Sequence, residues 1–348
     1  MLLCKEKIKR VLLINLKYLG DLVVCSPVFY SLRSYFNQAE IDIIVRAGYK
    51  SLFDFDKNID KVIEFDLIEQ RKKSGIQRIA SEINFIRNIR KKKYDLVITF
   101  HPTDRLALWS FISGAKYRVG FKDQSFGYLF NIQINIKEES VNYLDYYLET
   151  LRVINIPILS YKTYVNTNDI LRSEVNTFLK NTLLENQKKI IGIHPGASIK
   201  EKIWNIDNYI ELIKLLLKND IKILLFYGPN DLFLVDRIKE KINDDFLYII
   251  DTSRSIPLLI AFLEKCDLIV CNDSFVSHLA AALNKSTITL ISRNKLHCWK
   301  IYDMPNYVYI YGESCNECKN GVCSGYKCLQ RIKFKTVYEN IIEILNVN

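Results

Sequence analysis

The chain has 348 residues, more than the about 250–300 at which a single hydrophobic core usually stops growing, so we expect two domains. It is 49% apolar and 25% charged and has no low-complexity stretch or short repeat, which excludes a disordered or solenoid protein. The net charge is +10, of which residues 1–160 carry +7 (25 basic and 18 acidic groups) and residues 161–348 carry +3 (24 and 21). A basic first half suits a polyanionic partner, namely nucleic acid, an anionic membrane face or a phosphorylated glycolipid, but it is equally typical of a lysine-rich soluble surface.

No segment of the sequence has the about 20 uncharged apolar residues that a membrane-spanning helix needs. The most apolar early stretch, residues 11–30, is interrupted by Lys17 and Asp21. The basic N-terminus is followed by an apolar core too short for a signal peptide and by no small-residue cleavage site. We therefore expect a cytoplasmic protein that makes at most a transient, peripheral contact with the inner face of the cytoplasmic membrane.

Short β-branched runs alternate with amphipathic stretches along the chain, a pattern typical of βαβ units around a parallel sheet. In the first half this pattern predicts strands at 11–16, 41–45, 61–65 and 96–100 and helices at 27–35 and 76–90. In the second half it predicts strands at 190–194, 223–227, 248–250, 268–271 and 287–291 and helices at 206–218, 231–242, 256–264 and 278–283. The break at 154–168 predicts two Rossmann-like α/β domains, 1–160 and 161–348, with ligands bound in the loops after the strands.

The first such loop contains Gly20 and Asp21, directly before the first predicted helix. Glycine allows a tight turn, and the amides of a strand-to-helix turn favour anions. Asp21 has two interpretations at this stage: it caps the helix, or it acts as a general base on a substrate hydroxyl. The dinucleotide fingerprint G-x-G-x-x-G is absent from the sequence, which argues against an NAD-dependent enzyme.

The second loop runs from His194 through Gly196 and Ser198 to Lys202 and Trp204. It supplies backbone amides, a hydroxyl and positive charge, which together suit a diphosphate, although a solvated lysine loop over a packed tryptophan fits equally well. Its spacing differs from the P-loop pattern of nucleoside triphosphatases.

The third loop follows the predicted strand 268–271 and reads Asn272-Asp273-Ser274, with His278 opening an alanine-rich helix. The N-terminus of such a helix attracts phosphate through its unpaired amides and its dipole. Asp273 and Ser274 are also common helix caps, and His278 suits a packed core position. Three strand-end loops with complementary groups nevertheless favour a phosphate-bearing ligand.

Taken in order, these segments resemble the heptosyltransferases of glycosyltransferase family 9. The resemblance extends over about 270 residues and rests on four blocks. These are Leu19-Gly20-Asp21 with Pro27; Tyr94-Asp95-Leu96-Val97-Ile98 with Arg105, Ser113-Gly114-Ala115 and Arg118-Val119-Gly120-Phe121; Pro195-Gly196-Ala197-Ser198 with Lys202 and Trp204; and Asn272-Asp273-Ser274 with His278 and Ala280-Ala281-Ala282.

The resemblance implies the GT-B architecture, in which two Rossmann-like domains face a cleft: an acceptor-binding domain (1–160) and a nucleotide-sugar-binding domain (161–348). It implies inverting transfer of a sugar, heptose from ADP-heptose, to a lipopolysaccharide core, with Asp21 deprotonating the acceptor hydroxyl. No cofactor is required for catalysis, since Lys202 and the helix N-terminus stabilise the departing diphosphate. The implied donor-binding residues are Gly20, Gly196, Ser198, Lys202, Asp231, Asp273, Ser274 and His278, and the implied acceptor-binding residues are Lys17, His101 and Arg105.

Two further assignments have a structural alternative, because Asp231 also suits the first turn of a helix and His101 a core position. Two positions depart from the family pattern: Phe275 stands where glycine is usual, and Asn15 stands where arginine or lysine is usual, with Lys17 as its substitute. Both departures leave the donor sugar open.

Four cysteines crowd into the C-terminal segment 315–328: Cys315, Cys318, Cys323 and Cys328. Four thiolates at this spacing suit a structural zinc or iron, and free thiols or a disulfide are the alternatives. Because the segment lies away from the three loops, we expect such a metal to stabilise the C-terminal region and to take no part in catalysis.

Two other functions fit parts of the sequence. A nucleic-acid-binding protein with a Cys4 knuckle would place basic residues around the cluster, yet residues 311–330 contain only Lys319 and Lys327. A transferase of the same fold could instead use a protein or another glycan as acceptor. We therefore expect a nucleotide-sugar donor and an anionic glycolipid acceptor as partners, and no nucleic acid.

Overall fold

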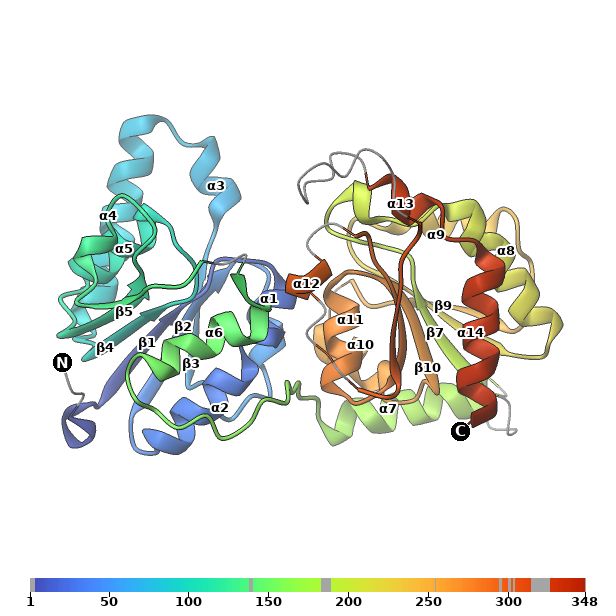
Figure 1. Cartoon of the computed structure of the whole chain (residues 1–348), viewed down its shortest axis with the longest axis horizontal. Coiled ribbons are helices and arrows are strands. Elements are labelled where there is room, and N and C mark those ends of the chain that lie inside the picture. The colour runs from blue at the N-terminus through green and yellow to red at the C-terminus, as the bar shows by residue number, and fades with distance from the viewer. Residues whose placement is uncertain are drawn as a thin grey trace. The chain divides into compact units, whose positions relative to one another are not determined.

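The computed structural model describes residues 4–137, 140–182, 189–253, 255–293, 296–299, 302, 304–313 and 326–347. The chain divides into two units, Met1–Thr163 and Tyr164–Asn348, so the division lies three residues beyond the predicted boundary. Each unit is a parallel sheet covered on both faces by helices (Figure 1).

The first unit contains a six-stranded sheet, in the part of the chain that the structure describes, with the order β3-β2-β1-β4-β5-β6. Its strands are β1 (Arg10–Ile14), β2 (Glu40–Arg46), β3 (Lys61–Phe65), β4 (Leu96–Thr99), β5 (Tyr117–Phe121) and β6 (Ile132–Ile134). Its helices are α1 (Leu19–Val24), α2 (Ser26–Tyr35), α3 (Leu67–Lys72), α4 (Gly75–Lys91), α5 (Asp104–Ile112) and α6 (Tyr143–Arg152).

The second unit repeats this arrangement, with the described strands in the order β12-β11-β10-β7-β8-β9. Its strands are β7 (Ile190–His194), β8 (Lys222–Tyr227), β9 (Leu247–Asp251), β10 (Leu268–Asn272), β11 (Ser286–Leu290) and β12 (Tyr307–Ile310). Its helices are α7 (Asp169–Asn181), α8 (Ile206–Lys218), α9 (Leu232–Lys239), α10 (Ile256–Leu263), α11 (Phe275–Ala282), α12 (Leu296–Trp299), α13 (Lys327–Gln330) and α14 (Phe334–Val347).

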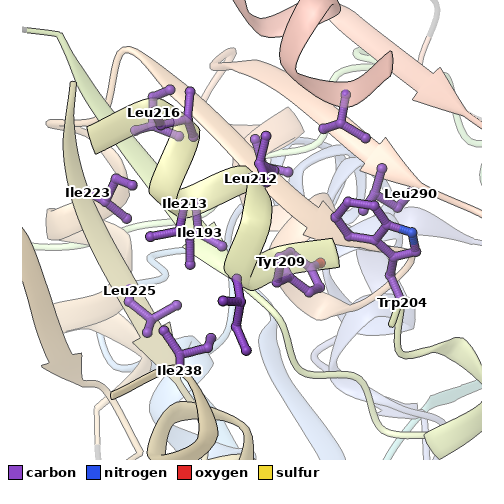
Figure 2. Close-up of a cluster of buried hydrophobic side chains, with 14 of the residues drawn as sticks. Ile193, Trp204, Tyr209, Leu212, Ile213, Leu216, Ile223, Leu225, Ile238 and Leu290 are labelled. Atoms are coloured by element: carbon purple, nitrogen blue, oxygen red, sulfur yellow. The ribbon is translucent and has the colours of Figure 1, made fainter. Parts of the chain in front are cut away.

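The core of the second unit shows why these segments fold as they do. Leucine and isoleucine recur every three or four residues along α8, so one face of the helix is apolar and lies on the sheet. Figure 2 shows Leu212, Ile213 and Leu216 of this helix above isoleucines and leucines of β7 and β8. Trp204, which is fully buried beside Tyr209, holds the start of the helix in place.

The predicted α/β class with two Rossmann-like parallel sheets is confirmed. Three strands that the pattern did not predict, β5, β6 and β12, extend the sheets at their edges. They are short or carry Arg, Gly or Gln within the run, so they lack a continuous apolar signal. The helix expected to open at His278 begins at Phe275, since Ser274 already takes the extended N-cap conformation.

Candidate functional site

Each sheet has one point where the strand order reverses: between β1 and β4 in the first unit and between β7 and β10 in the second. In open parallel sheets ligands bind at this reversal, beyond the carboxyl ends of the two strands. The three loops singled out in the sequence follow β1, β7 and β10, and His101 follows β4. The topology therefore gives each unit one candidate site.

Asp21 lies in α1, directly after β1, and its side chain is 4% exposed. Its Oδ2 accepts the backbone N–H of Tyr18 at 3.2 Å, so the helix-capping interpretation is confirmed. Its Oδ1 accepts the hydroxyl of Tyr147 in α6 at 2.5 Å. Because each carboxylate oxygen can accept two hydrogen bonds, capping does not prevent Asp21 from receiving a further hydroxyl. Gly20 is buried beside it in the first turn of the same helix.

Two of the predicted acceptor residues lie at this edge of the sheet. His101 follows β4, is 8% exposed, and its Nδ1 has no hydrogen-bond partner among the described residues. Burial, together with the charges of Lys17 and Arg46, lowers the pKa of His101 to about 3. The Nζ of Lys17 lies 5.3 Å from the ring centroid of Tyr143. The edge thus holds a neutral histidine in a positive environment.

Arg46 is a cation of this edge that the sequence reasoning missed. It ends β2, the neighbour of β1, donates from Nε to the carbonyl of Leu16, and stacks on the ring of Tyr18 at 4.4 Å. Its position directly after the predicted strand 41–45 is the sequence feature that could have identified it.

Arg105 lies elsewhere in the first unit. Its Nε donates to Glu82 Oε1 of α4 at 3.0 Å, and its guanidinium lies 5.9 Å from the ring of Phe65. No contact within the described residues joins it to Asp21, so the structure gives it a role in packing α5 against α4.

In the second unit Asn272 connects the loops that surround the strand reversal. It is fully buried at the end of β10 and donates from Nδ2 to the carbonyl of Pro195 at 2.7 Å. Its Oδ1 accepts the backbone N–H of Trp204 at 3.1 Å and the hydroxyl of Tyr209 at 3.2 Å. This one side chain therefore positions both ends of the loop after β7.

Lys202 and Asp273 form the principal charge pair of this edge, with 2.6 Å between Nζ and Oδ2. The side chains are 18% and 11% exposed. The next residue, Ser274, is the N-cap of α11, but its hydroxyl makes no capping bond and is buried with no partner among the described residues. A buried hydroxyl without a partner is rare in folded proteins and points to a polar group that binds there.

His278 lies in α11 within an aromatic cluster. Its Nδ1 lies 3.0 Å from the hydroxyl of Tyr302, and its ring centroid lies 5.6 Å from that of Trp299. Trp299 also lies 5.3 Å from the Nζ of Lys202, so it connects the histidine to the charge pair. Burial lowers the pKa of His278 to about 4, which keeps the ring neutral at physiological pH. Phe275, the departure from the family pattern, is half-buried in the first turn of this helix.

Asp231 lies on the other side of the loop after β7. Its carboxylate accepts the N–H of Gly228 at 3.2 Å and lies 3.6 Å from the Nε2 of His194. A Cβ on Gly196 would approach this carboxylate to 2.2 Å, so only glycine fits there. These contacts favour the structural interpretation of Asp231 as a brace for the loop. Ser198 lies exposed on the same loop.

Of the four cysteines predicted to hold a metal, the structure describes only Cys328. Its sulfur is buried and accepts the backbone N–H of Arg293 at 3.4 Å. Cys315, Cys318 and Cys323 lie outside the described residues. Elsewhere in the described ranges, no three His, Cys, Asp or Glu side chains gather closely enough to hold a metal ion.

Comparison with known proteins decides the class of the molecule. The sequence profile of glycosyltransferase family 9 (heptosyltransferase) matches residues 83–328, which is well over half of the chain. The chain belongs to glycosyltransferase family 9. This membership makes it a glycosyltransferase and favours that interpretation over a nucleic-acid-binding protein.

Individual members of the family are distant in sequence and close in fold. Lipopolysaccharide heptosyltransferase 2 of Escherichia coli is 23% identical over 295 residues, which cover 81% of this chain and 82% of that protein. The family 9 glycosyl transferase structure from Veillonella parvula matches with a TM-score of 0.81 at 20% identity, covering 98% of both chains. The structure of the E. coli ADP-heptose lps heptosyltransferase II matches with a TM-score of 0.76 at 19% identity, covering 97% of this chain and 98% of that one. The predicted GT-B fold class is confirmed.

The family 9 match includes every candidate donor residue except Gly20, along with His101 and Arg105, but begins after Lys17, Gly20 and Asp21. The assignment of Asp21 therefore depends on the geometry at the end of β1. Within the described residues no helix has the length and hydropathy needed to cross a membrane.

Proposed function

We propose that this family 9 glycosyltransferase transfers heptose from ADP-heptose to the core of a lipopolysaccharide, with inversion at the anomeric carbon. Support for the substrates comes from the relatives: the E. coli protein is a lipopolysaccharide heptosyltransferase, and the E. coli structure is that of an ADP-heptose enzyme. Support for the reaction comes from the two strand-end sites, which offer a base and an anion-binding group.

The observation that carries the proposal is the Lys202–Asp273 pair at the start of α11. Next to it is the buried hydroxyl of Ser274, which has no hydrogen-bond partner among the described residues. A diphosphate needs a cation, hydroxyl donors and free amides, and the first turn of α11 supplies the amides. Asp273 holds the Lys202 ammonium in place at this position. His278 is neutral, so it serves as a hydrogen-bonding group for the sugar or phosphate and adds no charge.

In the proposed reaction, Asp21 takes the proton of the acceptor hydroxyl as its oxygen forms a bond to the anomeric carbon. The bond from that carbon to the β-phosphate oxygen breaks, and ADP leaves with the electron pair. The negative charge that develops on the diphosphate is stabilised by Lys202 and by the amides of α11. Attack from the face opposite the leaving group inverts the anomeric configuration.

We propose an anionic glycolipid as the acceptor, presented at the cytoplasmic face of the inner membrane. Lys17 and Arg46 lie at the carboxyl edge of β1 and β2, and they make the surroundings of His101, at the same edge as Asp21, positive. Positive charge at this edge favours a phosphorylated acceptor over a neutral glycan.

The proposal is tested by measuring transfer from ADP-heptose to a truncated lipopolysaccharide core, with ADP-glucose as the competing donor. We expect turnover with ADP-heptose and a product of inverted configuration by nuclear magnetic resonance. Donor binding without transfer would exclude this acceptor. Absence of ADP-heptose binding, measured by calorimetry, would exclude heptose as the transferred sugar.

We also propose that the cysteine cluster holds a structural zinc or iron ion. Cys328 fits such a role, because its sulfur is buried and receives a backbone N–H, the kind of hydrogen bond that supports a thiolate ligand. The bound ion would hold the segment before α13 in place. The protein as purified should then contain one zinc or iron per chain by mass spectrometry. Cys315→Ser should lower the metal content and the melting temperature but leave the turnover of the surviving protein unchanged, whereas a metal-free wild type would refute the proposal.

A further inference from the structure

Helix α4 carries an exposed apolar stripe that the catalytic sites do not use. Ile76, Ile79 and Ile83 are 85%, 59% and 43% exposed. Their spacing of three and four residues places them on one face of the helix. Ile86, seven residues after Ile79, lies on nearly the same face but is buried, as is Ile89, so the exposed isoleucines belong to the part of the helix that precedes the packed part.

Basic residues continue this stripe toward the C-terminus of α4. Arg87 and Lys91 follow Ile83 by four and eight residues, on the same face. Both side chains are exposed, and neither forms an ion pair within the described ranges.

The two helices are fixed to the unit and to each other. Glu82 of α4 accepts from Arg105 at 3.0 Å and from the Nε1 of Trp109 at 2.7 Å, both in α5. Ser81 of α4 receives hydrogen bonds from Gln70 and Lys73 at 3.0 and 2.7 Å. Figure 1 shows α3 and α4 extending beyond the sheet of the first unit. The isoleucines are therefore presented on a supported projection.

We infer that the exposed stripe of α4, defined by Ile76, Ile79 and Ile83 with Arg87 and Lys91 on the same face, docks on an anionic lipid bilayer. Aliphatic side chains of an amphipathic helix enter the acyl boundary, while basic side chains beside them meet lipid phosphates. A protein-binding hot spot would instead be rich in tryptophan and tyrosine, and the three exposed apolar side chains of this stripe are all isoleucine. The biological role of this docking rests on the proposed function, because that function requires a membrane-borne acceptor. The physical argument for docking uses only the residues of this surface.

The test is co-sedimentation of the full chain with phosphatidylcholine vesicles, with and without phosphatidylglycerol, in the absence of donor and acceptor. We expect binding only to the anionic vesicles and release by high salt. Ile76→Ser/Ile79→Ser should weaken binding about tenfold or more, because two side chains no longer enter the bilayer. Arg87→Gln and Lys91→Gln should each weaken it about fivefold.

Matched controls lie in the second unit. Ile170 of α7 is 75% exposed, so Ile170→Ser removes an equally exposed isoleucine, and Lys239→Gln removes an exposed cation from α9. Both should bind vesicles as the wild type does. The inference is overturned if the wild type ignores anionic vesicles, if Ile76→Ser/Ile79→Ser binds equally well, or if that variant instead changes the oligomeric state on size exclusion. Because no turnover is measured, a lack of vesicle binding would not contradict the proposed transfer reaction. A lack of transfer would likewise not contradict vesicle binding.

Discussion

The two strand-end sites share one topology and present their carboxylates differently. In the first unit Asp21 accepts hydrogen bonds from the Tyr18 N–H and the Tyr147 hydroxyl. In the second unit Asp273 forms an ion pair with Lys202. The first arrangement presents a carboxylate to hydroxyl donors, and the second fixes an ammonium group in place. This difference supports the proposed division, in which the first site transfers the proton and the second stabilises charge.

The largest effect should come from Asp21→Asn, which preserves the size of the side chain and a capping oxygen but removes the base. We expect kcat to fall about 10²- to 10⁴-fold, while the affinity for ADP-heptose stays unchanged. The measurement is steady-state turnover combined with calorimetric donor binding.

A control for this variant is Asp95→Asn, because Asp95 also accepts backbone N–H groups, those of Lys9 and Arg10, next to the other end of β1. It should cost stability without lowering kcat comparably. Equal losses in both variants would show that Asp21 is needed only for folding.

Lys202→Gln should have the next largest effect, since it removes the cation expected to meet the departing diphosphate and leaves Asp273 unpaired. We expect kcat to fall about 10²-fold and donor binding to weaken, with Lys202→Arg retaining part of both. Single-turnover kinetics separates the two losses. If kcat is unchanged and only donor binding weakens, Lys202 binds the ground state and the transition state equally.

Tyr147→Phe removes the hydroxyl that donates to Asp21 and should lower kcat about tenfold near the acidic limb of the pH–rate profile. A hydrogen bond to the ionised carboxylate favours the charged form, so its loss should move this limb to higher pH, with the rate recovering at alkaline pH. Tyr146→Phe, in the same helix, is the matched control. An unshifted limb would show that Tyr147 only packs against Phe100.

The smallest effect concerns the histidine buried at each site. The pKa values of His101 and His278, about 3 and about 4, lie below the value of about 6.5 in an unfolded chain. The unfolded chain therefore binds more protons in acid, and stability falls as the pH drops below about 6.5. Each histidine should account for about 1 kcal/mol of the loss between pH 7 and pH 5.5, measured by urea unfolding. His101→Gln and His278→Gln should each flatten this dependence, and an unchanged slope in both would contradict the burial argument.

How well the sequence predicted each site depended on where its parts lie along the chain. In the second unit Lys202 and Asp273 were both singled out, since each stands in a loop after a strong apolar strand. Asn272 stands in the same loop motif, but its role was missed, because a buried asparagine that joins two loops looks like any strand-end polar residue. Trp299 was also missed, since nothing local marks it as a neighbour of Lys202.

In the first unit the missed residues are more distant in sequence. Tyr147 lies 126 residues from Asp21 and belongs to an amphipathic helix whose pattern indicates only packing. Arg105 shows the converse: the family resemblance implied an acceptor contact for it, whereas the structure shows an ion pair with Glu82 that depends on how α4 crosses α5.

By itself, the sequence determined the secondary structure of the buried strands, the two-domain plan and the loops that carry polar residues. These follow from local apolar patterning and from the rule that loops after parallel strands meet at one edge. Only the tertiary structure decided which donor reaches each carboxylate, which arginine stacks on Tyr18 at the edge of the first sheet, and that Asp231 braces a glycine. Such contacts join segments far apart in the chain, and their geometry depends on helix packing angles and side-chain burial, which no local pattern encodes.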